Sequence, residues 1–184
     1  GDVTGGKSAL IKSTDGGKTW KPVEGYDALG LFSGELKYPM WTDHMVRGTE
    51  PAKLYNEQNG IGCIHIEGGK VYVGTSVKGE PNIHVASVKD DKFEAVKALP
   101  NENYPLSITS DHNGNLFFTY IGGLAFAGAS GGAYKYNIAS GKVEKLSVSD
   151  NSIGMIEVDK KDPNKMFART CGMWSDQWCG TEWV

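Results

Sequence analysis

Residues 13–20, Ser-Thr-Asp-Gly-Gly-Lys-Thr-Trp, constrain the fold of this chain more than any other stretch. The apolar run before them predicts one β-strand, and the residues after them predict a second. Between the strands, Gly16 and Gly17 tolerate positive φ and the Asp15 carboxylate accepts backbone N–H groups, which together make a tight turn. We expect the Trp20 indole to pack back over this hairpin. An acid held in its own turn is poorly placed to reach a substrate, so Asp15 is predicted to be structural rather than catalytic.

A four-strand pattern then recurs about every 45 residues, which is typical of a β-propeller. Residues 1–25 end one blade, residues 26–60 form a long blade link, residues 61–98 and 105–148 each form a blade, and residues 152–184 form an incomplete blade. The predicted fold is therefore all-β, with about three blades of a larger ring, since propellers close with about 4–8. The expected strands are 61–66, 70–75, 82–88, 93–97, 106–110, 115–120, 132–137, 142–146, 153–158, 165–170 and 181–184.

Composition excludes several classes of function. The 184 residues carry a net charge of −3 and no basic stripe, which argues against nucleic acid as a partner. No apolar run approaches the roughly 20 residues of a membrane-spanning helix, so no membrane contact is expected. The first residue is not Met, so we expect a leader or a preceding segment.

The three cysteines point to packing or a disulfide rather than to a metal. Cys63 lies in an apolar, strand-like run and is expected to be a small core residue. Cys171 and Cys179 flank a short loop and are a candidate disulfide in an oxidising compartment, although the spacing leaves their pairing open. No second pair of Cys or His residues stands at zinc-ligand spacing, so neither a metal nor another cofactor is expected.

The long connections are predicted to share one end of the blades. In an antiparallel four-strand blade, the link between blades and the loop between the second and third strands lie opposite the tight turns, and function is expected where long loops converge. Exposed aromatic rings there stack on sugar rings, although the same rings also serve to pack loops. Asp176 and Asp43 are weak catalytic candidates, the latter beside His44. The predicted sugar-binding residues are Trp41, Phe126, Trp174, Asp176 and Trp178.

Residues 13–20 resemble an Asp-box, the repeated hairpin of sialidases, sortilin-type receptors and several propeller glycosidases, with Ser13, Asp15, Gly17 and Trp20 as its structural positions. From Pro105 onward the chain resembles the xyloglucan-cleaving endoglucanases of glycoside hydrolase family 74. The order of the matching stretches carries this resemblance more than any one of them. The stretches are 113–120, 131–137, 140–142, 153–159, 162–165 and the Trp-rich 173–178.

The resemblance implies a secreted endo-β-1,4-glucanase with two seven-bladed propellers and the polysaccharide, xyloglucan or another plant β-glucan, in the cleft between them. It implies inversion by two Asp residues, one from each propeller, of which one protonates the leaving oxygen and the other activates water. This chain corresponds to the later part of the first propeller, so it is expected to lack the catalytic pair. Its partners would be the remaining blades and the second propeller. The Cys171 and Cys179 pair and the loop at 122–128 depart from the family pattern.

Two other functions remain open from the sequence. One is a non-catalytic Asp-box propeller that binds glycans or protein, as sortilin-type receptors do. The other is a sialidase, which needs a cluster of arginines for the sugar carboxylate. Arg47 and Arg169 are the only arginines in the sequence, which lowers the sialidase alternative.

Overall fold

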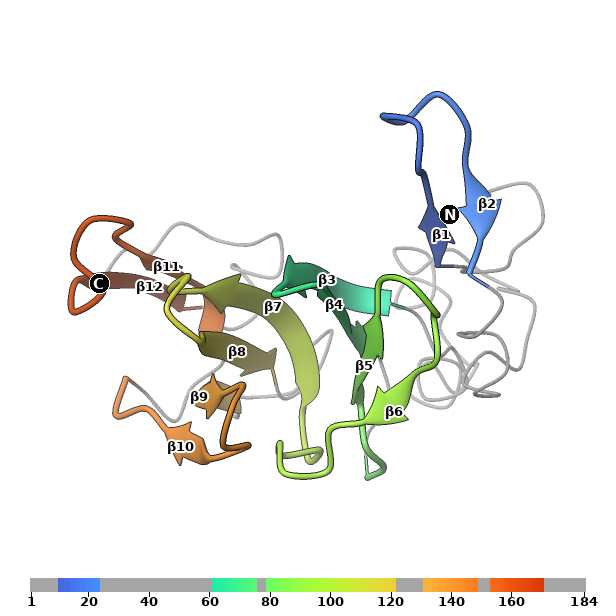
Figure 1. The fold of residues 1–184 in the computed structure, drawn as a ribbon. Coiled ribbons are helices and arrows are strands. Elements are labelled where there is room, and N and C mark those ends of the chain that lie inside the picture. The colour runs from blue at the N-terminus through green and yellow to red at the C-terminus, as the bar shows by residue number, and fades with distance from the viewer. Residues whose placement is uncertain (1–9, 24–60, 76–78, 122–130, 149–152, 171–184) are drawn as a thin grey trace, which may run out of the picture.

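The computed structural model describes residues 10–23, 61–75, 79–121, 131–148 and 153–170, and the regular elements within these ranges are all β-strands (Figure 1). Among these residues there is no helix of the length and apolarity that a membrane span requires. The strands are β1 (Ile11–Lys12), β2 (Lys21–Pro22), β3 (Ile61–Glu67), β4 (Lys70–Thr75), β5 (Ile83–Ser87), β6 (Glu94–Ala95), β7 (Tyr104–Ser110), β8 (Asn115–Ile121), β9 (Gly131–Asn137), β10 (Val143–Lys145), β11 (Ile153–Val158) and β12 (Met166–Thr170).

Two four-stranded antiparallel sheets form the middle of the described structure. Strands β3, β4, β5 and β6 make one sheet in chain order, and strands β7, β8, β9 and β10 make the other. The turn between β3 and β4 uses Gly68 and Gly69 at φ of 57° and 74°, where a side chain would be strained. Short turns of this kind join β3 to β4 and β7 to β8, and the sequence supplies them.

A two-stranded hairpin flanks each sheet. Strands β1 and β2 form the hairpin at residues 13–20, and β11 pairs with β12 at the other side of the structure. The first hairpin is attached by an ion pair between Lys12 and Asp91, which lies between β5 and β6. The second is attached by a hydrogen bond from the Thr119 hydroxyl of β8 to the Gly154 carbonyl, at 3.4 Å.

The core lies between sheets rather than on one side of them. Residues that are directly opposite in an antiparallel pair share a face, and successive residues of a strand alternate between faces. Val71 and Val73 of β4 therefore face the first hairpin, whereas Tyr72 between them faces the β7–β10 sheet, and all three are buried. The interface between the two four-stranded sheets, called here the central interface, contains Tyr72, Ile83, Val96, Leu99, Ile108, Leu116, Phe118 and Tyr120.

The second sheet is covered in the same way. Phe118 of β8 points into the central interface, where its ring meets that of Tyr72 edge-on at a centroid distance of 6.5 Å. Phe117 points to the opposite face and packs with Ile153 and Ile156 of β11. Because both faces of β4 and β8 are covered, these strands are apolar runs without a polar alternation.

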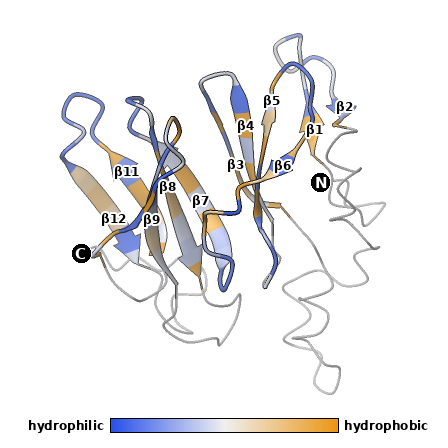
Figure 2. Ribbon diagram, turned by 60° about the horizontal axis from the view of Figure 1, so that its bottom comes forward, coloured by the Kyte–Doolittle hydropathy of each residue, from blue (hydrophilic) through white to orange (hydrophobic). Residues whose placement is uncertain are grey.

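The first strands of successive units lie beside one another. Strand β7 contacts both β3 and β11, and Figure 2 shows the sheets standing side by side with their strands roughly parallel to a common axis. The approach is close at the start of β3, because a Cβ on Gly62 would come within 2.6 Å of the Pro105 carbonyl oxygen. Sheets stacked through their faces, with first strands innermost, form a partial β-propeller. The fold is all-β, as the sequence predicts.

The strand predictions are confirmed for the inner strands and are too long for the outer ones. The predictions at 70–75 and 153–158 coincide with β4 and β11, and β7 begins two residues earlier than predicted, at Tyr104. The strand predicted at 93–97 is shorter in the structure, where β6 contains Glu94–Ala95 alone. An outer strand has one neighbouring strand to pair with, so fewer of its residues are held in the sheet. Cys63 is half-buried and packs against the central interface, and the prediction at 181–184 lies outside the described residues.

Candidate functional sites at the two ends of the blades

The two ends of the sheets differ in their connections. Tight turns join β3 to β4, β7 to β8 and β11 to β12 at one end. The register places Ile61, Ile121 and Thr170 at the other end, where the chain adjoins residues 24–60, 122–130 and 171–184 (Figure 2). The segments predicted to bind sugar are therefore attached to one common end of the blades.

The predicted binding residues themselves lie outside the described residues. The same holds for both catalytic candidates, for the proposed disulfide and for one of the two arginines, so these assignments stay predictions. They are Trp41, Asp43, His44, Arg47, Phe126, Cys171, Trp174, Asp176, Trp178 and Cys179. Arg169 is described and lies on β12, opposite Met155 of β11.

Asp15 lies inside its own turn. Its Oδ1 accepts the Thr19 N–H at 2.9 Å and the Ser13 hydroxyl at 2.8 Å, and its Oδ2 accepts the Thr19 hydroxyl at 2.6 Å. Gly16 and Gly17 have φ of 72° and 87°. The Trp20 indole N–H donates to the Gly17 carbonyl at 3.0 Å, so the ring lies over the turn while 57 % of the residue remains exposed.

These hydrogen bonds decide the chemistry of the Asp15 carboxyl group. The Thr19 side-chain hydrogen bond, followed by the Thr19 backbone and the Ser13 hydroxyl, lowers the pKa of Asp15 to about 2. A general acid must hold a proton near neutral pH, which this group does not. Asp15 therefore forms the turn and is unsuited to acid catalysis.

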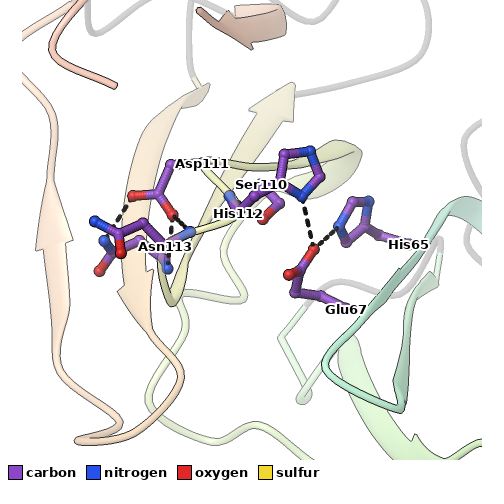
Figure 3. Close-up of polar contacts among 7 residues, drawn as sticks. His65, Glu67, Ser110, Asp111, His112 and Asn113 are labelled. Carbon is purple, nitrogen blue, oxygen red and sulfur yellow. Dashed lines mark hydrogen bonds and ion pairs between the residues drawn. The ribbon is translucent and has the colours of Figure 1, made fainter. Parts of the chain in front are cut away.

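A second aspartate does the same in the turn between β7 and β8. Asp111 accepts the N–H groups of Asn113 and Asn115 at 2.8 and 3.0 Å and the Asn115 side-chain amide at 2.7 Å (Figure 3). Burial opposes ionisation of this carboxyl, but the Asn115 and Asn113 hydrogen bonds outweigh it and lower the pKa of Asp111. Asp15 and Asp111 thus each hold the backbone of their own turn.

Beside the Asp111 turn is a polar cluster that was not predicted from the sequence. Glu67 at the end of β3 has its Oε2 3.5 Å from His65 Nε2 and 3.3 Å from His112 Nδ1 (Figure 3). His112 belongs to the neighbouring sheet, so its contact with Glu67 depends on how the two sheets stack. The only signal in the sequence is that His65 and Glu67, two apart in a strand, share a face.

Neither a metal site nor a reactive thiol emerges from the described residues. No three His, Cys, Asp or Glu side chains in the described ranges are arranged to hold a metal ion. Cys63 is a free thiol, and burial raises its pKa to about 12. A thiol that stays protonated is a poor nucleophile, so Cys63 contributes to packing.

Comparison with known proteins supports the fold and leaves the family open. No family model matches the sequence, and no curated protein matches it. Among solved structures, the chain is similar to the GH74 enzyme of Niastella koreensis, with a TM-score of 0.61 and 22 % identity over 89 % of this chain and 22 % of that one. The chain thus spans about a fifth of the length of that enzyme.

Two further structures match less well. The extracellular domain of a putative hybrid two-component system from B. thetaiotaomicron gives a TM-score of 0.46 and 18 % identity over 62 % of this chain and 15 % of that one. The extracellular domain of a putative one-component system from the same organism gives a TM-score of 0.47 and 16 % identity. The match covers 92 % of this chain and 20 % of that one.

Proposed function

We propose that this chain is part of a secreted polysaccharide hydrolase, an endo-β-1,4-glucanase that acts on xyloglucan by inversion. The observation that carries the proposal is the fold likeness to a GH74 enzyme over 89 % of the chain, at a TM-score of 0.61. The ordered family motifs from Pro105 onward point to the same class. In this proposal the described strands are scaffold, and the remaining blades and a second propeller complete the substrate cleft.

The sugar-binding role is proposed for the end of the blades from which the long segments depart. Strands β8 and β12 end there, at Ile121 and Thr170, and β3 begins there, at Ile61. Aromatic rings brought to one end offer flat apolar faces to pyranose rings, and Asp176 offers an acceptor for hydroxyl groups. The proposed contacts are Trp41, Phe126, Trp174, Asp176 and Trp178.

The chain supplies at most one acid of the proposed pair. Asp15 and Asp111 accept hydrogen bonds from their own turns, and the weak catalytic candidates stay those predicted from the sequence, Asp43 and Asp176. An inverting mechanism needs a protonated acid and a carboxylate about 6.5–9.5 Å apart, across the scissile bond. The isolated 184-residue chain is therefore expected to be inactive.

Release of reducing ends from xyloglucan tests the proposal. A polypeptide that carries the further blades and the second propeller should release them and should lower the viscosity of the solution early, because an endo enzyme cuts within the chain. The isolated chain should do neither. Binding of xyloglucan by the longer polypeptide without any cleavage would favour the alternative, a non-catalytic glycan-binding propeller, and hydrolysis by the isolated chain would point to Asp43 or Asp176.

A further inference from the structure

The turn between β7 and β8 contains one of the two Asn-Gly pairs of the sequence, Asn113-Gly114. The other pair, Asn59-Gly60, lies outside the described residues. In such a pair the backbone nitrogen of the glycine can attack the side-chain amide carbon of the asparagine, because no Cβ on the glycine hinders the approach. The surroundings of the pair decide whether the folded chain permits this reaction.

The surroundings of Asn113 and Gly114 leave both reacting groups accessible. The two residues are exposed to solvent, and a Cβ on Gly114 would meet no atom within 4 Å beyond its chain neighbours. Within the part of the chain that the structure describes, neither the side-chain amide of Asn113 nor the N–H group of Gly114 has a hydrogen-bond partner. The nucleophile and the carbon that it attacks are therefore both open.

Asn164, in the turn between β11 and β12, offers a matched contrast. The Asn113 N–H donates to Asp111 Oδ1 at 2.8 Å (Figure 3), and the Asn164 N–H donates to Asp162 Oδ1 at 3.1 Å. Both asparagines are exposed. However, the residue after Asn164 is Lys165, whose N–H donates to the Asp162 carbonyl at 2.9 Å. The two turns thus share an aspartate acceptor and differ at the attacking nitrogen.

We propose that Asn113 is a site of spontaneous deamidation through a succinimide formed with Gly114. A base in the solvent takes the proton of the Gly114 N–H while the nitrogen bonds to Asn113 Cγ. The Cγ–Nδ2 bond then breaks, and Nδ2 leaves with a proton from the solvent as ammonia. Water adds to one of the two ring carbonyl carbons, and the bond from that carbon to the ring nitrogen breaks. Opening at Cγ gives aspartate, whereas opening at the main-chain carbonyl gives isoaspartate.

The isoaspartate product distorts the turn, whereas the aspartate product preserves it. Asp111 Oδ1 accepts the N–H groups of Asn113 and Asn115 at 2.8 and 3.0 Å. In isoaspartate the main chain runs through the former side chain, which places an additional carbon atom between these two N–H groups. One carboxylate oxygen then no longer reaches both of them. The Gly114 carbonyl, which accepts the Ile138 N–H at 3.0 Å, moves with the chain.

The distortion also reaches the central interface. His112 directly precedes Asn113, and its Nδ1 lies 3.3 Å from Glu67 Oε2 of the neighbouring sheet (Figure 3). A loosened turn therefore weakens a contact between the two four-stranded sheets. This inference concerns the scaffold and stands independently of the proposed substrate.

Peptide mapping by mass spectrometry after incubation at pH 8.0 and 37 °C tests the site. Deamidation changes the peptide mass because a hydroxyl replaces the amide nitrogen, and an isoaspartyl methyltransferase labels the isoaspartate form. We expect Asn113 to convert at least about tenfold faster than Asn164, since Gly114 has neither a side chain nor a hydrogen bond at its nitrogen. Equal rates at the two positions would overturn the proposal. Conversion of Asn113 only in chains unfolded by guanidinium chloride would overturn it as well.

Urea unfolding measures the consequence for the turn, in an Asn59→Gln background that removes the other Asn-Gly pair. The incubated chain is compared with the Asn113→Asp variant, which carries the same charge on an unmodified main chain. Isoaspartate should raise the equilibrium constant of unfolding by about two- to tenfold, the effect of one lost hydrogen bond. Incubated Asn113→Gln is the control and should not change. An incubated chain as stable as Asn113→Asp would contradict the loosening of the turn.

Discussion

At the scale of single residues, one carboxylate organises the hairpin between β1 and β2. Asp15 takes three hydrogen bonds from Ser13 and Thr19, and the two glycines that follow allow the reversal. These bonds favour the ionised form, which lowers the pKa of Asp15 in the folded chain to about 2. An unfolded chain has an ordinary aspartate pKa near 3.9, so folding and ionisation are linked.

The pH dependence of Asp15→Ala follows from this linkage. A carboxyl group whose pKa is lower in the folded state stabilises that state above its unfolded pKa and loses the effect as pH falls through its folded pKa. The gap in urea midpoint between wild type and Asp15→Ala should therefore be constant above pH 5 and shrink between about pH 4 and pH 2. Asp15→Asn, which keeps one acceptor oxygen, should lie between them at pH 6. A gap that does not change with pH would contradict the role of the charge.

Gly74, which lies opposite Cys63 in the β3–β4 pair, is a position where the packing leaves no room for a side chain. A Cβ at Gly74 would overlap the Cys63 sulfur and come within 3.0 Å of the Pro105 ring. Gly74→Ala should therefore destabilise the chain by about 1–3 kcal/mol, the usual cost of overpacking. Cys63→Ala in the same chain should recover part of that loss, and thermal unfolding of the four variants measures the recovery. No recovery would place the conflict at Pro105 alone.

At the scale of strands, position relative to the stacked sheets decides how much a side chain matters. Phe118 is fully buried between two sheets, whereas Phe167 of β12 is 68 % exposed on the face that points away from the β7–β10 sheet. Both residues are phenylalanines in strands, so their β-propensity is the same and their burial differs. Comparing substitutions at the two positions therefore measures the effect of burial alone.

Alanine at these two phenylalanines should give very different losses. Phe118→Ala removes a ring from the central interface and should lower the free energy of unfolding by about 3–5 kcal/mol. Phe167→Ala should change it by less than about 0.5 kcal/mol, as is usual on a surface. Urea unfolding at pH 7 measures both. Similar losses would indicate that another part of the molecule covers Phe167.

The sequence predicted the tight turns and the inner strands, but neither the short outer strands nor the contacts between sheets. Gly68-Gly69 and residues 111–114 are turn signals that local chemistry explains, and apolar runs such as residues 116–118 indicate strands. The contact between the side chains of Glu67 and His112 was not predictable from the sequence. It depends on how the β3–β6 and β7–β10 sheets pack against each other rather than on any local pattern. The weak periodicity of residues 26–60 offered no comparable signal.

At the scale of the whole molecule, both outer faces of the stack carry exposed apolar side chains. Ile64 and Ile66 of β3 are 51 % and 64 % exposed and extend the face on which Val71 and Val73 meet the first hairpin. Phe167 of β12 is 68 % exposed on the face that points away from the β7–β10 sheet. Isoleucines that continue a buried interface are the surface that a neighbouring blade would cover, in accord with the proposal of a larger ring.

Thiol labelling tests whether a further blade covers β3. In chains otherwise free of cysteine, a thiol reagent should modify the Ile66→Cys variant rapidly in the 184-residue chain. In a polypeptide with further blades, labelling should be at least about tenfold slower, because the reagent must wait for local opening. A Glu144→Cys variant, exposed on β10, should react equally in both. Equal rates at position 66 would contradict the larger ring.

The central proposal, that Trp174 and Trp178 bind polysaccharide, is tested most directly by titration calorimetry with xyloglucan oligosaccharides. The longer polypeptide is compared with its Trp174→Ala and Trp178→Ala variants. If each ring stacks on a sugar and contributes on the order of 1 kcal/mol, each variant should bind about five- to tenfold more weakly, with its melting temperature nearly unchanged. Unchanged affinity together with a large drop in melting temperature would make these rings packing residues and would contradict the assignment of the binding face.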